Sequence, residues 1–240
     1  MKKSAYIIIR CAASRVRLTA CLAVISAVPL SAAQDNDSRL TLRYDRPAEY
    51  FEEALVIGNG TMGATVYGGT HTDKISLNDI TLWTGEPDRE VTTPGAYKAL
   101  PDIRALLDKE DYHGADRANR KIQGHYSETY QPLGQLTIEY DGRSARRVKN
   151  YIRTLDISRA VAATEYNCGE MRCTTEYFAS APDSVIVVRL RAGGGGINAM
   201  LRFASQLPCS VTSAGGEITA EGFAAYKSES HSRPTRREAA

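Results

Sequence analysis

Histidine, tryptophan and net charge are all scarce in this chain of 240 residues, and each shortage argues against a class of function. There are four histidines, and they do not combine with any of the five cysteines at the spacing of a zinc site. The formal net charge is only +2, and no basic stripe with interleaved aromatic residues runs through the middle of the chain. We therefore expect no nucleic-acid partner, no metal and no cofactor.

The chain also lacks an apolar run long enough to span a bilayer comfortably. Residues 18–30 are uncharged, follow five basic residues, and precede small residues at 31–33 of the kind that a signal peptidase recognises. We predict a signal peptide at residues 1–33 and cleavage before Gln34. The protein would then be exported, periplasmic or extracellular, with no membrane contact after cleavage. An uncleaved interfacial helix and a lipid anchor on Cys21 remain alternatives.

Cysteine is sparse in the mature chain as well. Removal of the leader leaves Cys168, Cys173 and Cys209, an odd number for an oxidising compartment. The first two flank a predicted hairpin turn, but whether their Cβ atoms meet depends on strand register. We favour three free thiols, and the pairing stays open.

Short alternating stretches of apolar and polar residues are abundant, and this is the pattern of half-buried strands. Turn residues such as Asn59-Gly60 and Pro182-Asp183 separate these stretches. The predicted strands occupy residues 40–44, 55–57, 63–67, 74–77, 136–140, 161–167, 171–178, 184–191 and 199–205. The pattern predicts a mainly β fold, a large antiparallel β-sandwich of the super-sandwich type.

A helical period interrupts the strands. Five apolar residues between positions 97 and 107 fall on one helix face, and residues 112–122 form a second short helix that Gly124 ends. We interpret both as a helical insertion in a sandwich domain of residues 34–225. Residues 226–240 show no apolar period and are predicted to be a disordered or aberrant tail.

Five short sequence motifs between residues 55 and 190 indicate a protein family. Residues 55–64 combine an apolar stretch, Gly-Asn-Gly, two variable residues and Gly-Ala, and residues 75–85 place Leu-Asn-Asp before Thr-Leu-Trp-Thr-Gly. Three more blocks occupy residues 130–134, 151–156 and 177–190. In this order they resemble the N-terminal domain of the glycoside hydrolase family 95 α-L-fucosidases. Asp79 and Thr84 depart mildly from the family, which commonly has Glu and Ser there.

The resemblance implies a function for a longer protein. Family members place an (α/α)6 catalytic barrel after the sandwich and hydrolyse terminal α-L-fucosides with inversion. Inversion requires a general acid and a second group that activates water, and in the family both lie in the barrel. We therefore expect that this chain is truncated before the barrel and has no catalytic residue. Fucosylated glycans would be its partners only through the missing catalytic domain.

Two pairs of carboxylates within the chain are close in sequence: Asp73 with Asp79, and Glu86 with Asp88. Closeness in sequence sets neither the separation nor the raised pKa that an inverting pair requires. We interpret all four as solvated loop carboxylates.

Asn59, Asn78 and Trp83 are candidates for a surface that faces the substrate or the barrel. An asparagine side chain donates and accepts hydrogen bonds, which suits sugar hydroxyls, and a tryptophan stacks on sugars or seals interfaces. The ordinary alternatives are burial for Trp83 and turn capping for Asn78. Two other functional hypotheses compete: a standalone glycan-binding sandwich without catalysis, and an unfolded remnant with exposed apolar surface.

Overall fold

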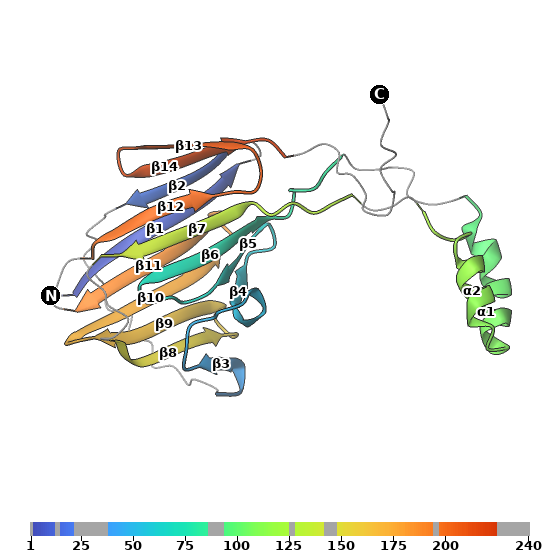
Figure 1. Ribbon diagram of the computed structural model, residues 1–240, viewed down its shortest axis with the longest axis horizontal. Coiled ribbons are helices and arrows are strands. Elements are labelled where there is room, and N and C mark those ends of the chain that lie inside the picture. The colour runs from blue at the N-terminus through green and yellow to red at the C-terminus, as the bar shows by residue number, and fades with distance from the viewer. Residues whose placement is uncertain are drawn as a thin grey trace, which may run out of the picture. The chain divides into compact units, whose positions relative to one another are not determined.

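A computed structural model of the chain describes residues 2–12, 15–21, 38–85, 94–124, 128–141, 148–193 and 197–224 (Figure 1). The chain divides into two compact units. The first comprises residues 1–82 and 131–224, and the second comprises residues 83–130 and 225–240. The second unit interrupts the first where the sequence predicts helices.

The smaller sheet of the first unit has five antiparallel strands in the order β12-β7-β6-β5-β4. The strands are β4 (Leu55–Gly58), β5 (Met62–Val66), β6 (Thr72–Asp79), β7 (Gly134–Tyr140) and β12 (Ala199–Ala204). The first three form consecutive hairpins, as expected from the turn residues between them. At the β4–β5 turn, Gly60 adopts φ +91°, a conformation that glycine reaches without strain.

The larger sheet has nine strands in the order β13-β14-β2-β1-β11-β10-β9-β8-β3, and every neighbouring pair is antiparallel. The strands are β1 (Lys2–Ala12), β2 (Arg15–Cys21), β3 (Thr41–Tyr44), β8 (Val148–Asp156), β9 (Val161–Cys168), β10 (Met171–Ser180), β11 (Val185–Gly193), β13 (Cys209–Ala214) and β14 (Glu217–Gly222). Short 3-10 turns at Ser38–Leu40 and Phe51–Glu53 precede β3 and β4.

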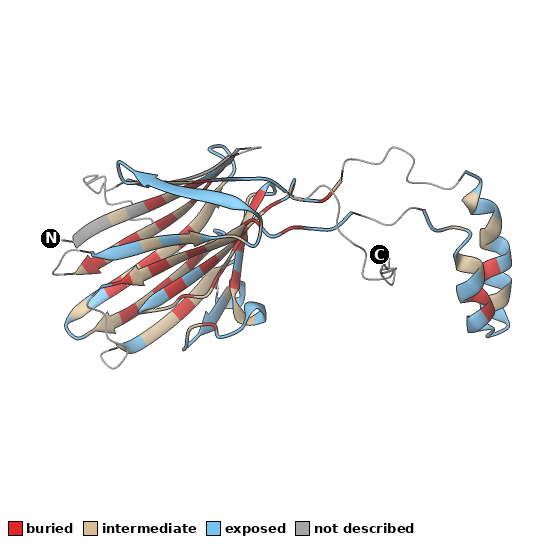
Figure 2. Ribbon diagram, turned by 45° about the horizontal axis from the view of Figure 1, so that its top comes forward, coloured by how far each residue is buried: buried red, intermediate tan, exposed pale blue. Residues whose placement is uncertain are grey.

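The core lies between the two sheets. Buried and partly exposed residues alternate along the strands (Figure 2), because successive side chains point to opposite faces. Ile75 and Leu136 of the small sheet and Ile186 and Val188 of the large sheet belong to one apolar cluster. Each such side chain contributes roughly 1.5–3 kcal/mol on burial. The prediction of a mainly β antiparallel sandwich with a short helical insertion is confirmed.

The segment predicted as a signal peptide contributes strands to this sheet. β1 and β2 form a hairpin, and Ile7 and Ile9 of β1 are buried. Over residues 2–12 and 15–21 the chain is therefore extended and does not form the interfacial helix that was one alternative. The leader and its cleavage stay predictions, because residues 22–37 lie outside the described ranges.

The second unit contains the predicted helices. A 3-10 turn at Ala96–Ala99 leads into α1 (Leu100–Asp108), and α2 (Tyr112–Asn119) follows after a short turn. Asp111 caps α2 by accepting a hydrogen bond from the N–H of Gly114 at 2.8 Å. Ile103 of α1 and Gly114 and Ala115 of α2 are buried.

Several strands carry no prediction from the sequence: β1, β2, β8, β13 and β14. The β13–β14 hairpin turns at Gly215-Gly216, both with positive φ, so a glycine pair marked it in the sequence. Cys168, Cys173 and Cys209 are free. Register explains why Cys168 and Cys173 do not meet, since they lie opposite Met171 and Tyr166 respectively. The predicted tail, residues 226–240, lies outside the described residues.

Candidate functional site

Four of the five motif blocks meet at one end of the first unit. Hydrogen bonds of 2.9 Å join them, from Asn59 Nδ2 to Ser180 O, from Ile80 N to Thr61 O and from Gln131 N to Leu82 O. We call residues 59–61, 78–82, 131–133 and 180–183 the signature end. It gathers the β4–β5 turn, the end of β6, the approach to β7 and the β10–β11 turn.

The side chain of Asn59 stabilises the signature end through hydrogen bonds to three backbone groups. Its Oδ1 accepts hydrogen bonds from the backbone N–H groups of Thr61 and Met62 at 3.0 and 2.8 Å. Its Nδ2 reaches the carbonyl of Ser180 on the larger sheet. The Asn59 side chain therefore uses three hydrogen bonds within the chain: two stabilise the β4–β5 turn, and the third connects the two sheets.

Asn78 is placed differently. It lies on β6 opposite Gly63, between the buried residues Leu77 and Asp79, so its side chain is on the outer face of the small sheet. Its Oδ1 is buried and has no hydrogen-bond partner among the residues that the structure describes. An unsatisfied buried acceptor costs about 1–3 kcal/mol, so a donor from outside the chain would be stabilising here.

Asp79, and not Asn78, caps the turn that follows β6. The carboxylate of Asp79 accepts hydrogen bonds from the backbone N–H and the hydroxyl of Thr81, at 2.9 and 2.6 Å. Asp79 thereby ends β6.

Trp83 belongs to the second unit, where it forms an isolated antiparallel bridge with Tyr130. The two rings pack edge to face, with centroids 6.0 Å apart. Both side chains are exposed, at 46% and 43%. Simple burial of Trp83 was therefore the wrong alternative, and an exposed aromatic pair is available to a partner.

Thr84 connects the segment that carries Trp83 to the segment that carries Tyr130. It is buried, its hydroxyl donates to the carboxylate of Glu128 at 2.5 Å, and that hydroxyl accepts from the N–H of Thr129 at 2.8 Å. Gly85 follows with φ +69°, and a Cβ there would meet the Glu128 side chain at 2.5 Å. The two chain segments are thus held together next to the aromatic pair.

The fourth block, on β8, lies away from the signature end and serves the core. Arg153 is 1% exposed, donates from Nη1 to the carbonyl of Glu53 at 2.8 Å, and lies 4.7 Å from the centre of the Tyr44 ring. A Cβ at Gly68 would come within 2.8 Å of this arginine, which explains a glycine at that turn.

The interpretation of Asp73 and Asp79 as solvated carboxylates was wrong. Both are buried on the inner face of β6, at 0% and 6% exposure, because they share the parity of Ile75 and Leu77. They lie six positions apart along the strand, which is about 20 Å and far from the ~6.5–9.5 Å of an inverting pair. The other pair, Glu86 and Asp88, lies outside the described residues.

Sequence analysis named Asp73 but missed its burial. Its carboxylate accepts hydrogen bonds from the hydroxyl of Tyr177 at 2.5 Å and from the N–H of Gly69 at 2.8 Å. Burial raises the pKa of Asp73 from 3.8 to about 6, although these hydrogen bonds act in the opposite direction. The sequence did contain a sign of this burial: Asp73 lies two positions before Ile75 on β6, so both side chains point to the inner face.

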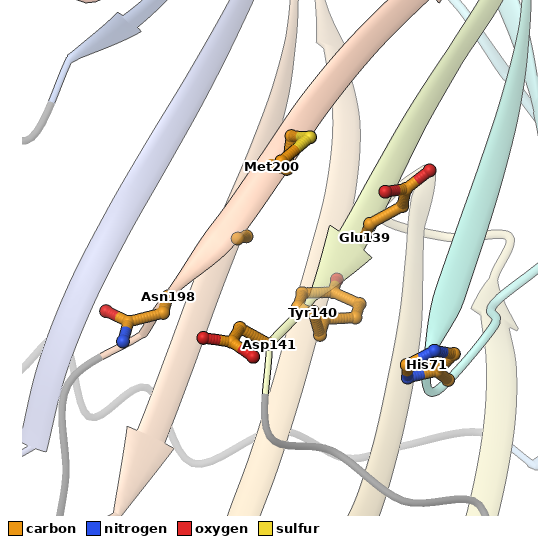
Figure 3. A pocket seen from close by; sticks show the side chains of 7 residues that line it. His71, Glu139, Tyr140, Asp141, Asn198 and Met200 are labelled. Atoms are coloured by element: carbon orange, nitrogen blue, oxygen red, sulfur yellow. The ribbon is translucent and has the colours of Figure 1, made fainter.

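A pocket of about 470 Å³ opens at the opposite end of the small sheet, where β7 ends and β12 begins (Figure 3). Its lining residues are His71, Glu139, Tyr140, Asp141, Asn198, Ala199 and Met200. The backbone N–H of Asp141 donates to Asn198 O at 3.0 Å and holds the two strand ends together. Figure 3 shows His71, Asp141 and Asn198 around Tyr140, so amide, carboxylate and imidazole groups share one opening.

Within the described ranges, no three His, Cys, Asp or Glu side chains are grouped so that they could hold a metal ion. No helix in that part of the chain is both long and apolar enough to cross a bilayer.

Comparisons with known proteins give consistent matches. The family model described as glycosyl hydrolase family 65, N-terminal domain, matches residues 42–237. Alpha-L-fucosidase 2 of Arabidopsis thaliana is 35% identical over 176 residues, which cover 72% of this chain and 21% of the relative. Probable alpha-fucosidase A of Aspergillus niger is 31% identical over 174 residues, covering 68% and 21%. The protein of the same name from Aspergillus oryzae is 28% identical over 146 residues, covering 58% and 20%. The chain thus spans about a fifth of the length of these relatives.

Proposed function

Because the chain belongs to the family of glycosyl hydrolase family 65 N-terminal domains, we propose that it is the N-terminal domain of a secreted, inverting α-L-fucosidase. The family match and the α-fucosidases among the relatives confirm the resemblance that the motif blocks predicted. The observation that carries the proposal is the similarity to α-fucosidases over one fifth of their length, across most of this chain.

In this proposal the chain supports catalysis and does not perform it. Protonation of the leaving oxygen and activation of water require two carboxyl-type groups about 6.5–9.5 Å apart across a sugar ring. Asp73 and Asp79 are buried at opposite ends of one strand and cannot reach a sugar. The acid and base would come from a catalytic barrel that follows this domain in the whole protein.

Two features offer contacts to such a barrel. On the first unit, the half-buried Asn78 side chain lies on the outer face of the small sheet beside Gly63, and its Oδ1 has no partner among the described residues. On the second unit, the exposed rings of Trp83 and Tyr130 supply apolar area. A polar contact and an aromatic contact together are typical of domain interfaces.

An activity assay tests whether the chain alone lacks fucosidase activity. The purified chain, incubated with an aryl α-L-fucoside, is expected to release no aryl alcohol above the buffer rate, while an active α-L-fucosidase in parallel turns the substrate over. Clear turnover by the chain would refute a purely supporting role.

A complementation assay tests the family role itself. The chain is mixed with Alpha-L-fucosidase 2 of Arabidopsis thaliana from which the matched segment has been deleted. We expect the chain to raise fucosidase activity, and Asn78→Ala and Trp83→Ala to weaken that gain, whereas Asp45→Ala does not. No gain with a folded chain and a soluble deletion protein counts against the proposal.

Export is the part of the proposal that comes from the leader sequence alone. Expression of the full chain with a C-terminal tag, followed by fractionation and N-terminal sequencing, is expected to yield an exported product that begins at Gln34. A product that retains Met1 and stays in the cytoplasm contradicts export.

A second function, glycan binding without catalysis, is favoured by the pocket between β7 and β12. Its exposed Asp141 and Asn198 side chains suit sugar hydroxyls, and about 470 Å³ accommodates more than one sugar ring. Titration with a fucosylated oligosaccharide is the test. Saturable binding that Asn198→Ala abolishes and Ser210→Ala preserves would favour this function.

A further inference from the structure

The N-terminal hairpin fills a gap in the large sheet. β1 pairs with β11 over nine residues, from Lys2 opposite Gly193 to Arg10 opposite Val185. β2 pairs with β1 on one side and with β14 on the other. In the described sheet, the hairpin Lys2–Cys21 is therefore the link between β11 and the β13–β14 pair.

The hairpin also closes the core. Ile7 and Ile9 are 3% and 0% exposed and join the apolar cluster that contains Val188 and Leu190 of β11. Ile8 lies between them on the opposite face and is half-buried. Without β1, nine residues of β11 would present unpaired backbone groups beside an apolar stripe. Such an edge is a template for an incoming strand.

The β13–β14 pair depends on the same hairpin. β14 pairs only with β13 and β2 among the described strands, and a two-stranded hairpin alone is marginally stable in water. Ala220 of β14 is buried and lies opposite Val16 of β2. Loss of the hairpin would therefore free one side of β14 as well as β11.

The segment that fills this gap is also the segment with the composition of an export leader. The five basic residues of that leader all lie within β1 and β2. A strand paired in a folded sheet has to leave it before export, and cleavage before Gln34 would remove both strands from the mature chain.

From these observations we propose that the gap between β11 and β14 is a strand-acceptor site and that the hairpin Lys2–Cys21 is its exchangeable occupant. Backbone pairing with β11 and β14 holds the hairpin, and the alternating apolar side chains of Ile7 and Ile9 set its register. The hairpin binds in the same way whether or not it is covalently attached. That the hairpin can leave rests on the export included in the proposed function, whereas the pairing of the hairpin with β11 and β14 does not.

The experiment uses the full chain with a protease site introduced between residues 22 and 37. The chain is folded, cut, and mixed with an excess of a fluorescent peptide of residues 2–21. We expect the labelled peptide to replace the cut hairpin with one peptide per chain. A peptide with Ile9→Asp is expected to bind at least about tenfold more weakly than its matched control with Ile8→Asp, because only Ile9 enters the core.

Hydrogen exchange provides the second measurement. After the cut hairpin is washed away, the amides of β11 and β14 are expected to lose protection and to regain it when the peptide is added. Failure of the labelled peptide to enter, whether the cut hairpin is retained or lost, overturns the proposal. Protection of β11 and β14 without any hairpin overturns it too, because the gap would then close by itself or around a second copy of the chain.

Discussion

Asp73 contributes a pH dependence to the stability of the sandwich. Its pKa is about 6 in the folded chain, against 3.8 when unfolded, so the folded state holds this proton more tightly. The stability that protonation adds is fully present below pH 3.8 and is lost as pH rises through 6. The loss amounts to about 3 kcal/mol at most.

Asp73→Asn is therefore expected to abolish this contribution. We expect the urea midpoint of the wild type to fall relative to that of Asp73→Asn between about pH 4 and pH 7. Tyr177→Phe removes a hydrogen bond that lowers the pKa of Asp73, so it should move the transition to higher pH. Asp45→Asn, at an exposed carboxyl, is the control. Parallel profiles for the wild type and Asp73→Asn contradict the prediction.

The two asparagines of the signature end should respond in opposite ways to truncation. Asn59→Ala removes three hydrogen bonds and leaves the Ser180 carbonyl without its partner, so we expect a loss of about 1–3 kcal/mol in unfolding free energy. Asn78→Ala removes a buried acceptor that has no partner among the described residues, so its unfolding free energy should be at least that of the wild type, with a gain of at most about 1–3 kcal/mol. Urea denaturation at neutral pH measures both. Equal losses would mean that Asn78 is structural.

At the scale of the elements, the β5–β6 turn has little room for a side chain at Gly69. A Cβ at Gly69 would lie 1.8 Å from the carbonyl oxygen of Thr72, and the backbone would have to move. That movement would also disturb the hydrogen bond from the Gly69 N–H to Asp73.

We therefore expect Gly69→Ala to lower the unfolding free energy by roughly 2–4 kcal/mol. Gly193→Ala is the matched control, because its Cβ would meet nothing closer than 3.8 Å. Similar thermal midpoints for the two variants would show that the turn is more adaptable than its geometry indicates.

At the scale of the whole molecule, the helical unit should be dispensable for the sandwich. The chain leaves and re-enters through paired segments, with Thr84 N–H bonded to Thr129 O at 2.9 Å. A two-residue turn such as Asn-Gly can close a pair of this kind.

We predict that replacing residues 85–128 with Asn-Gly leaves a folded sandwich. Its circular dichroism should retain the strand signal and lose the helical one, and hydrogen exchange should show β6 and β7 still protected. A protein with unprotected β6 and β7 would instead make the helical unit part of the folding of the sandwich.

The sequence by itself determined the local elements. The period-two alternation of β5, β6 and β7 and the 3.6-residue period of α1 are properties of neighbouring side chains, so they can be recognised without coordinates. The turn residues between the strands and the motif blocks are local in the same sense, and they were enough to identify the family.

Only the tertiary structure decided what these elements face. The burial of Asp73, the exposure of Trp83 and the meeting of four motif blocks depend on segments far away in the sequence. The same holds for β1, whose residues 2–10 pair with residues 185–193 although their composition suggests a leader. Strand pairing of this kind is a contact between distant residues, and a single sequence holds no local signal for it.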